Sequence, residues 1–286
     1  MVQFLTSAQS AQWRSYLNRL PPELSDIHFH PEMMAPYEAC DLGEGSLLVV
    51  EQGKDFFIQP LLRMKDGAYR HPYNFGGPIA TEGFVVERIM YPYPCTLNPF
   101  LHKRQNELLL GKAKCVKDAV WIDLTQPFKL RQTTRHLVTK AGALGVKVEP
   151  VEKNSQNIDT FFLLYSKHMK MVGALPHWKF PKEWFISLLH NLGTMSTLMF
   201  AKENDAVVGA CLLIHEHGTC YYHFAATSFR SPHGASHRMV VFAAEHANSL
   251  GCKRFHLGGG VEANDGLFTF KAGFSDLRLP IYKYEE

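Results

Sequence analysis

The stretch Leu257–Phe274, LGGGVEANDGLFTFKAGF, holds the first residues that could do chemistry. Three successive glycines let a backbone pass close to another group or adopt angles that other residues avoid. Lys271 lies between Phe270 and Phe274, and an ammonium group in such a setting could stabilise an oxyanion or a phosphate. The alternative is a lysine whose aliphatic stem packs on the two phenylalanines. The residues alone leave both open.

A second candidate is the loop Ser228–Gly234, which precedes a predicted helix. Backbone N–H groups at the start of a helix favour an anion, and a glycine allows close approach. The loop and the first helical turn supply further donors and charge from Arg230, His233, Gly234, Ser236, His237 and Arg238. A solvated turn before an ordinary helix start is the alternative. The loop is therefore a candidate anion site.

Two weaker candidates lie elsewhere in the chain. In Arg70–Pro78, RHPYNFGGP, Tyr73 and Asn74 could hydrogen-bond a substrate, although such segments are often only turns. His256, in the strand before the glycines, could be a general base or a satisfied core histidine. The 15 histidines show no spacing with acidic or cysteine partners that indicates zinc, so we expect no metal.

The pattern of apolar residues predicts the elements that would position these groups. Helices are expected from Ile158 to Val172, from Pro181 to Gly193 and over 235–250, with three strands between the last two. A short strand, Arg254–Leu257, follows the last helix, and this order implies a parallel strand pair. In the first half, a strand is expected over 120–124 and a linker helix over 130–144.

The two halves of the chain resemble each other. Residues 47–67 and 198–218 align without gaps at an offset of 151, each with a strand, a polar turn and a longer strand. An aromatic third strand follows each time, over 68–75 and 219–227. Two copies in 286 residues predict an α/β (α+β) tandem of related domains, 1–145 and 146–286. Each would be a mixed, mostly antiparallel sheet flanked by helices.

Composition restricts the function classes. The net charge of +3 is too small to imply nucleic-acid binding by itself. The 6 cysteines are scattered, and no apolar run approaches the roughly 20 residues of a membrane span. These observations, with the lack of a signal sequence, predict a cytoplasmic protein. No nucleophile elbow, Walker loop or dinucleotide fingerprint occurs.

The YNFGGP turn, the segment VWIDL at 120–124, the twin strand modules and the terminal LGGG…DGLFTFKAGF together resemble the FemAB-like branch of the GNAT acyltransferase superfamily. The resemblance covers most of the chain from about residue 40 and implies two GNAT-type domains, the second catalytic. GNAT enzymes commonly carry Arg/Gln-x-x-Gly-x-Gly/Ala in the pyrophosphate loop. Here Gly234 follows Arg230 one residue late, and this departure leaves the donor open.

The resemblance implies an N-acyltransferase that moves an acyl group from an acyl-CoA donor, such as acetyl-CoA, to an amine on a small molecule or an envelope or polysaccharide precursor. Lys271 and Phe270 would line the reaction channel, and the loop at 233–236 would bind the donor. The further expected site residues are Tyr222, His223, Gly258 and Gly259. One alternative is an aminoacyl-tRNA-dependent enzyme acting on a peptidoglycan precursor, and another is a non-catalytic ligand-binding module.

Overall fold

The computed structural model describes residues 1–72, 75–85, 93–127 and 129–285, and it divides into two compact units. Unit 1 comprises Met1–Asp118 and Leu279–Glu286, and unit 2 comprises Ala119–Arg278. The dividing points fall within strands β7 (Lys114–Asp123) and β13 (Arg278–Tyr284). Helix α4 (Gln132–Ala143), expected as a linker in a first domain ending at 145, therefore lies in unit 2. The boundary of the repeated fold at 145/146 stays a prediction.

Unit 1 is built on an antiparallel sheet whose strands follow the order β1 (Val2–Thr6), β2 (Glu44–Gln52), β3 (Asp55–Arg63) and β4 (Tyr69–Arg70), with β5 (Ile79–Ala80) also paired to β3. Its other described elements include helices α1 (Ser10–Leu17), α2 (Ala35–Ala39) and α3 (His102–Leu108), several short 3-10 helices, and the short strand β6 (Cys95–Thr96), which pairs with β13.

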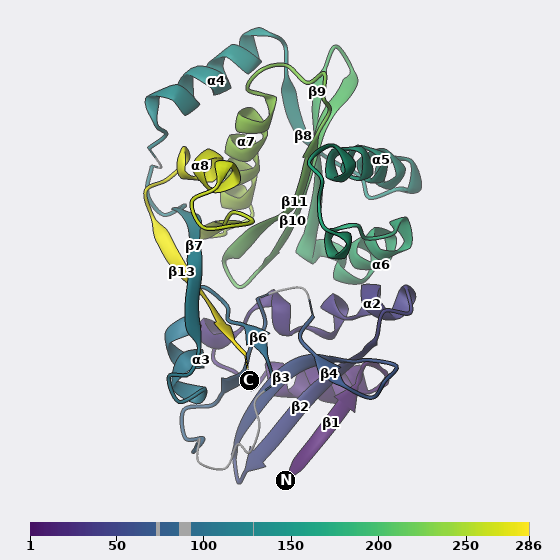
Figure 1. Cartoon of the computed structure of the whole chain (residues 1–286), viewed down its shortest axis with the longest axis vertical. Helices are drawn as coiled ribbons and strands as arrows, with labels where there is room; N and C mark the ends of the chain where they lie inside the picture. Colours follow the sequence, from purple (N-terminus) through teal and green to yellow (C-terminus); the bar gives the residue numbers. More distant parts are fainter. Residues whose placement is uncertain (73–74, 86–92, 128, 286) are drawn as a thin grey trace. The chain divides into compact units, whose positions relative to one another are not determined.

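Unit 2 holds a mixed sheet in the order β7, β12 (Arg254–Gly258), β11 (Thr219–Thr227), β10 (Ala206–Glu216), β9 (Ser196–Glu203), β8 (Lys147–Val151). Strands β9, β10 and β11 form the predicted antiparallel meander, and β11 and β12 form the predicted parallel pair. Helix α7 (Ala235–Ser249) covers one face, and α5 (Ser155–Met171) and α6 (Lys182–Leu192) cover the other (Figure 1). A last helix, α8, spans Gly266–Ala272.

The hairpins explain the offset between the halves. Strand β2 ends at Gln52 and β3 starts at Asp55, while β9 ends at Glu203 and β10 starts at Ala206. In the second hairpin, Asn204 and Asp205 both have positive φ, as a type I′ turn requires. The predicted third strand of the first half is wrong in extent, because β4 has only two residues.

Each face of the unit 2 sheet has its own core. Under α7, small and aliphatic side chains such as Ala243, Ala244 and Leu213 allow the helix to approach the strands closely. Under α5 and α6 the core is aromatic, with Phe185 and Phe224 at 5.3 Å between ring centroids. Phe161, Tyr165, Phe180 and Trp184 complete that aromatic layer. Unit 2 is thus a mostly antiparallel sheet with one parallel strand pair, packed against helices on both faces.

Candidate functional site

The parallel pairing of β11 with β12 is short. It covers Thr219–Tyr221 opposite Arg254–His256, although β11 continues to Thr227. In the pairing with β10, Leu213 faces Tyr222 and Leu212 faces Phe224, so His223 is the extra residue of a β-bulge. A bulge bends a strand and disrupts its ladder. The described pairing of β11 with β12 thus stops at Tyr221, and the bulge bends β11 away from a continuous parallel ladder.

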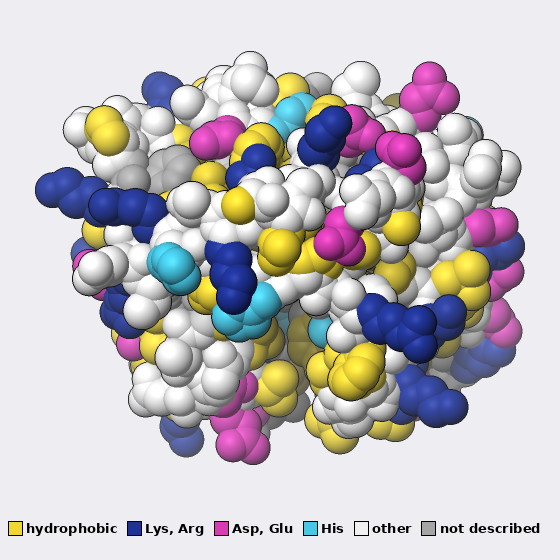
Figure 2. All heavy atoms as spheres, turned by 90° about the horizontal axis from the view of Figure 1, so that it is seen from above, with side chains coloured by type: hydrophobic (Ala, Val, Ile, Leu, Met, Phe, Trp, Pro, Cys, Tyr) yellow, Lys and Arg dark blue, Asp and Glu magenta, His cyan; other side chains and the backbone are white. Residues whose placement is uncertain are grey.

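Helix α7 begins where β11 ends, with Gly234 as its N-cap at φ 93°. No side chain caps this start in the described structure, so backbone N–H groups of the first turn remain available to an anion. Arg230 and His233 are exposed beside it, and residues 227–240 contain no Asp or Glu. The surface that contains this end of unit 2 carries Lys, Arg and His side chains beside a hollow (Figure 2).

Close packing, in addition to the positive φ, requires a glycine at position 234. A Cβ at this position would lie 2.2 Å from the backbone oxygen of Leu137 in α4, so the close approach predicted for this residue is made by a helix. Arg238 reinforces the same contact, since its Nε donates to the Val146 oxygen at 2.7 Å and its guanidinium lies over the Phe242 ring. Arg238, which the sequence predicts to bind the acyl donor, thus links α7 to the segment that follows α4.

The glycine run and Lys271, both predicted from the sequence, lie together. Lys271 Nζ donates to the Gly259 oxygen at 2.6 Å, and a Cβ on Gly258 would lie 3.3 Å from Nζ. Gly260 is required by Asp265, whose Oδ1 would lie 2.1 Å from an added Cβ. The glycines therefore allow helix α8 and its N-cap to pack closely against this loop.

Asp265 is the residue that sequence reasoning missed. Its Oδ1 accepts from the Phe268 N–H and its Oδ2 from the N–H groups of Val261 and Glu262, so one carboxylate caps α8 and closes the glycine loop. Burial favours a raised pKa for Asp265, but these backbone hydrogen bonds outweigh it and lower the pKa. The sequence did contain a signal for this N-cap, because Asp265 and Gly266 precede an apolar run and Asp is a preferred N-cap residue.

His237 joins the two candidate sites. From the first turn of α7, its ring meets the edge of the Phe270 ring at 4.8 Å between centroids, and Phe270 packs on Phe274 at 5.2 Å. Burial lowers the pKa of His237, and neighbouring His233 lowers it further. The imidazole is therefore mostly neutral near pH 7 and packs as an aromatic ring against Phe270 and Phe274.

Of the remaining predicted residues, Tyr222 lies in β11 and His256 in β12. Tyr222 contacts Cys211, and burial, with that thiol, raises its pKa well above the ordinary value. His256 is buried, 2% exposed, with its ring 5.3 Å from that of Tyr221. Tyr73 and Asn74 fall outside the described residues. Next to them, Gln105 Nε2 donates to the Gly76 oxygen at 2.7 Å and fixes the glycine turn.

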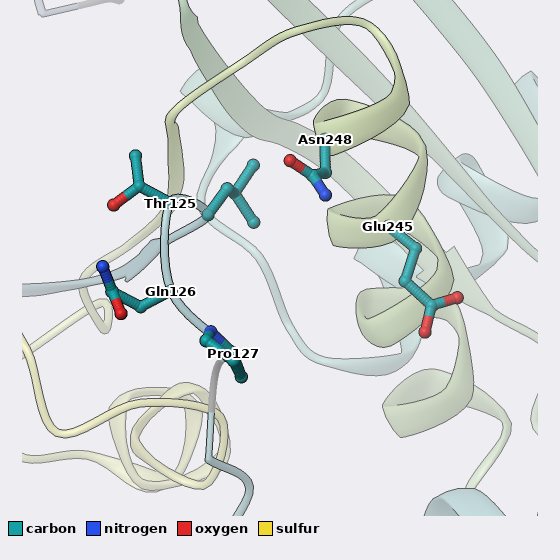
Figure 3. A pocket seen from close by; sticks show the side chains of 6 residues that line it. Thr125, Gln126, Pro127, Glu245 and Asn248 are labelled. Atoms are coloured by element: carbon teal, nitrogen blue, oxygen red, sulfur yellow. The ribbon is translucent and has the colours of Figure 1, made fainter.

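A separate hollow of about 460 Å³ lies at the far end of α7. Thr125, Gln126 and Pro127, on the loop after β7, face Glu245 and Asn248 of the helix (Figure 3). Glu245 is 11 residues from Gly234, which places it on the order of 16 Å along the helix axis. None of the predicted site residues lines this hollow. Among the described residues, no group of three or more His, Cys, Asp or Glu is arranged to hold a metal ion.

The family model for the acetyltransferase (GNAT) domain matches residues 129–271, half of the chain. The chain belongs to the GNAT acetyltransferase family. This range contains strands β11 and β12, the α7 N-terminus and Lys271. The predicted resemblance to the GNAT superfamily is confirmed. The family supports acyl transfer as the activity. A comparison with curated proteins found no match.

Solved structures share the fold at low identity. FemX matches 100% of this chain with 97% of its own, at a TM-score of 0.65 and 12% identity. A protein from Agrobacterium fabrum is provisionally described as the C-terminal domain of a lysylphosphatidylglycerol synthetase. It matches 97% of this chain with 92% of its own, at a TM-score of 0.61 and 13% identity. A tandem GNAT protein from the clavulanic acid biosynthesis pathway matches 100% of this chain with 98% of its own, at a TM-score of 0.51 and 9% identity. The predicted tandem α/β fold is thereby confirmed.

No helix among the described residues combines the length and the apolar character that crossing a membrane requires.

Proposed function

We propose that the protein is an N-acyltransferase that moves an acyl group from an acyl-CoA-type donor, such as acetyl-CoA, to an amine. The observation that carries the proposal is the divergence of β11 from β12 directly before the uncapped N-terminus of α7. A diphosphate suits that helix start. The amide-bearing arm of coenzyme A is extended, and it suits an exposed strand edge because such an edge offers unpaired backbone groups.

In this mechanism Arg230, His233 and the N–H groups of Ser236 and His237 would hold the diphosphate. The acyl carbonyl lies near the glycine run. The neutral amine attacks the carbonyl carbon, a C–N bond forms, and the C–S bond breaks with departure of the thiolate. Positioning of the two reactants supplies much of the acceleration.

Lys271 has two roles in the proposal. Its ammonium holds the glycine loop through the Gly259 oxygen, and with the loop N–H groups it stabilises the negative charge that develops on the carbonyl oxygen. The amine proton passes to water or to His256, two residues before Gly258. Phe270, Tyr222 and His223 are proposed to line the acceptor path.

An aminoacyl-tRNA donor is the second candidate, because α4 and the segments that flank it are rich in Lys and Arg. Residues 129–148 include Lys129, Arg131, Arg135 and Lys140 and no Asp or Glu. A tRNA backbone would be held there by charge, with strong dependence on salt. The acceptor would then be a peptidoglycan precursor, as the resemblance to FemAB-like enzymes implies.

Thermal stabilisation of the purified chain separates these donors. We expect acetyl-CoA at about 100 times its dissociation constant to stabilise the fold by roughly 2.7 kcal/mol. An Arg230→Ala/His233→Ala variant should lose most of this shift. Lys253→Ala removes an exposed charge just beyond the other end of α7 and should keep it. Stabilisation by aminoacyl-tRNA but not acetyl-CoA would favour the second donor, and binding of acetyl-CoA without transfer to any amine would favour a binding module.

A further inference from the structure

Helix α5 and the segment after it expose apolar side chains on the outside of unit 2. Leu163, Met171, Val172 and Leu175 are 56%, 50%, 55% and 55% exposed. Leu163 and Met171 share a stripe of α5 with Lys167 and Lys170, since these positions are related by i, i+4, i+7 and i+8. We name Leu163, Lys167, Lys170, Met171, Val172, Leu175 and Lys179 the α5 surface. Exposed apolar groups gathered in this way indicate an interaction site.

The segment that presents these side chains has a defined backbone. After α5 the Ala174 N–H donates to the Met169 oxygen and the Gly173 N–H to the Lys170 oxygen, with Gly173 at φ 64°. This is the Schellman ending of a helix. The Tyr165 hydroxyl then donates to the Trp178 oxygen at 2.6 Å and anchors the next turn to α5. These hydrogen bonds therefore fix the backbone that presents Val172 and Leu175 to solvent.

Lysines outnumber carboxylates around these apolar groups, although Asp159 and Glu183 flank the segment. Residues 160–182 contain Lys167, Lys170, Lys179 and Lys182 and no Asp or Glu. Lys182 pairs with Asp159 at 3.1 Å. Within the described part of the chain, no carboxylate pairs with the other three lysines. The α5 surface thus combines aliphatic groups with lysines that no carboxylate neutralises.

We propose that the α5 surface attaches the protein to an anionic lipid surface. Aliphatic side chains interleaved with lysines suit the interface of a bilayer, where the apolar groups enter the headgroup boundary and the ammonium groups meet anionic lipids. The core of a protein interface is usually depleted of lysine. Single-stranded nucleic acid prefers aromatic side chains for stacking, and Met171, Val172 and Leu175 offer none.

This attachment is independent of the donor site. Helix α5 packs on the face of the sheet opposite α7, so the α5 surface and the α7 N-terminus belong to different layers of unit 2. Attachment would bring the enzyme to an amine or acyl group carried at a membrane without using the residues that hold the donor. Loss of attachment should therefore leave activity on a water-soluble amine unchanged.

Co-sedimentation with vesicles tests the proposal. The full chain should bind vesicles of equal parts phosphatidylcholine and phosphatidylglycerol and bind phosphatidylcholine alone more weakly. Met171→Ser/Leu175→Ser should reduce binding through lost apolar contact, and Lys167→Ala/Lys170→Ala should reduce it about fivefold for each lysine. The control Leu144→Ser/Leu250→Ser changes two leucines that are each 45% exposed elsewhere and should bind normally. Circular dichroism of each variant confirms the fold.

The result that overturns the proposal is equally specific. Vesicle binding that is absent, or unchanged by both α5 surface variants, rules out a lipid surface. A wild-type dimer in light scattering that Met171→Ser/Leu175→Ser converts to a monomer would show that a second copy covers the surface instead.

Discussion

Lys271 is the residue at which the geometry of the glycine loop and the proposed catalytic role meet. Its Nζ is 2.6 Å from the Gly259 oxygen, so it would hold the glycine run while it stabilises negative charge. Methionine keeps most of the aliphatic length without the ammonium. We expect Lys271→Met to lower kcat about 100-fold, the usual effect of losing one oxyanion donor. Steady-state kinetics on purified protein measure this.

The structural part of the effect can be separated. Loss of one hydrogen bond from a charged group should cost about 1–2 kcal/mol of unfolding free energy. Lys271→Arg retains a donor and should recover part of the rate. A Lys271→Met enzyme with wild-type kcat would remove Lys271 from the mechanism.

Gly234 makes a second prediction at the residue scale. Alanine there meets both a positive φ and the Leu137 oxygen, so Gly234→Ala should cost about 2–4 kcal/mol in denaturant unfolding. Gly251, just past the opposite end of α7, has φ 80° and no atom within 4 Å of an added Cβ. Gly251→Ala therefore isolates the backbone cost, about 1 kcal/mol. Equal losses in the two variants would contradict the close contact with α4.

At the scale of elements, α8 depends on Asp265. Removing the carboxylate leaves three backbone N–H groups without their acceptor, and we expect Asp265→Ala to cost about 1–2 kcal/mol and to loosen the glycine loop. Transfer activity should fall with it. Asn154→Ala removes the N-cap of α5, whose side chain accepts from the Asn157 N–H.

The Asn154 variant is a matched control because it should lose similar stability and keep its activity. Hydrogen exchange at residues 258–272 would report the loosened loop directly. Activity lost equally in both variants would mean that general stability, and not the α8 cap, controls transfer.

At the scale of the whole molecule, three partly buried histidines couple folding to pH. Burial is the main cause of the lowered pKa values of His215, His237 and His246. The unfolded chain, with ordinary histidine pKa values near 6.5, binds more protons than the folded chain just below that pH. Stability should thus be complete above about pH 6.5 and decrease as the pH falls through the lowered values.

Thermal unfolding followed from about pH 7.5 to about pH 5.5 measures this coupling. The slope of Tm against pH should be shallower in His237→Gln, because one of the three groups is then absent. A wild-type Tm that is constant below about pH 6.5 would contradict the lowered pKa values.

The sequence by itself determined the elements whose signals are local. The twin hairpins at an offset of 151, the linker helix at α4 and the helix at α7 follow from apolar spacing, turn residues and glycine stops within a few residues. The sharpest part of the family resemblance, the terminal glycines with Phe270, Lys271 and Phe274, also lies in a single segment. These parts were predictable because neighbours in the chain fix their conformation.

Tertiary structure alone decided how the site is assembled. The point where β11 leaves β12, the approach of α4 to Gly234, the enclosure of Tyr222 beside Cys211 and the two-residue length of β4 all depend on residues far apart in the chain. Gly234 illustrates the difference: its sequence context suggested room for a ligand, and the structure supplies a helix backbone 2.2 Å from where a Cβ would lie. Spacing along a chain reports periodicity, whereas contact distances report packing, and the site is made by packing.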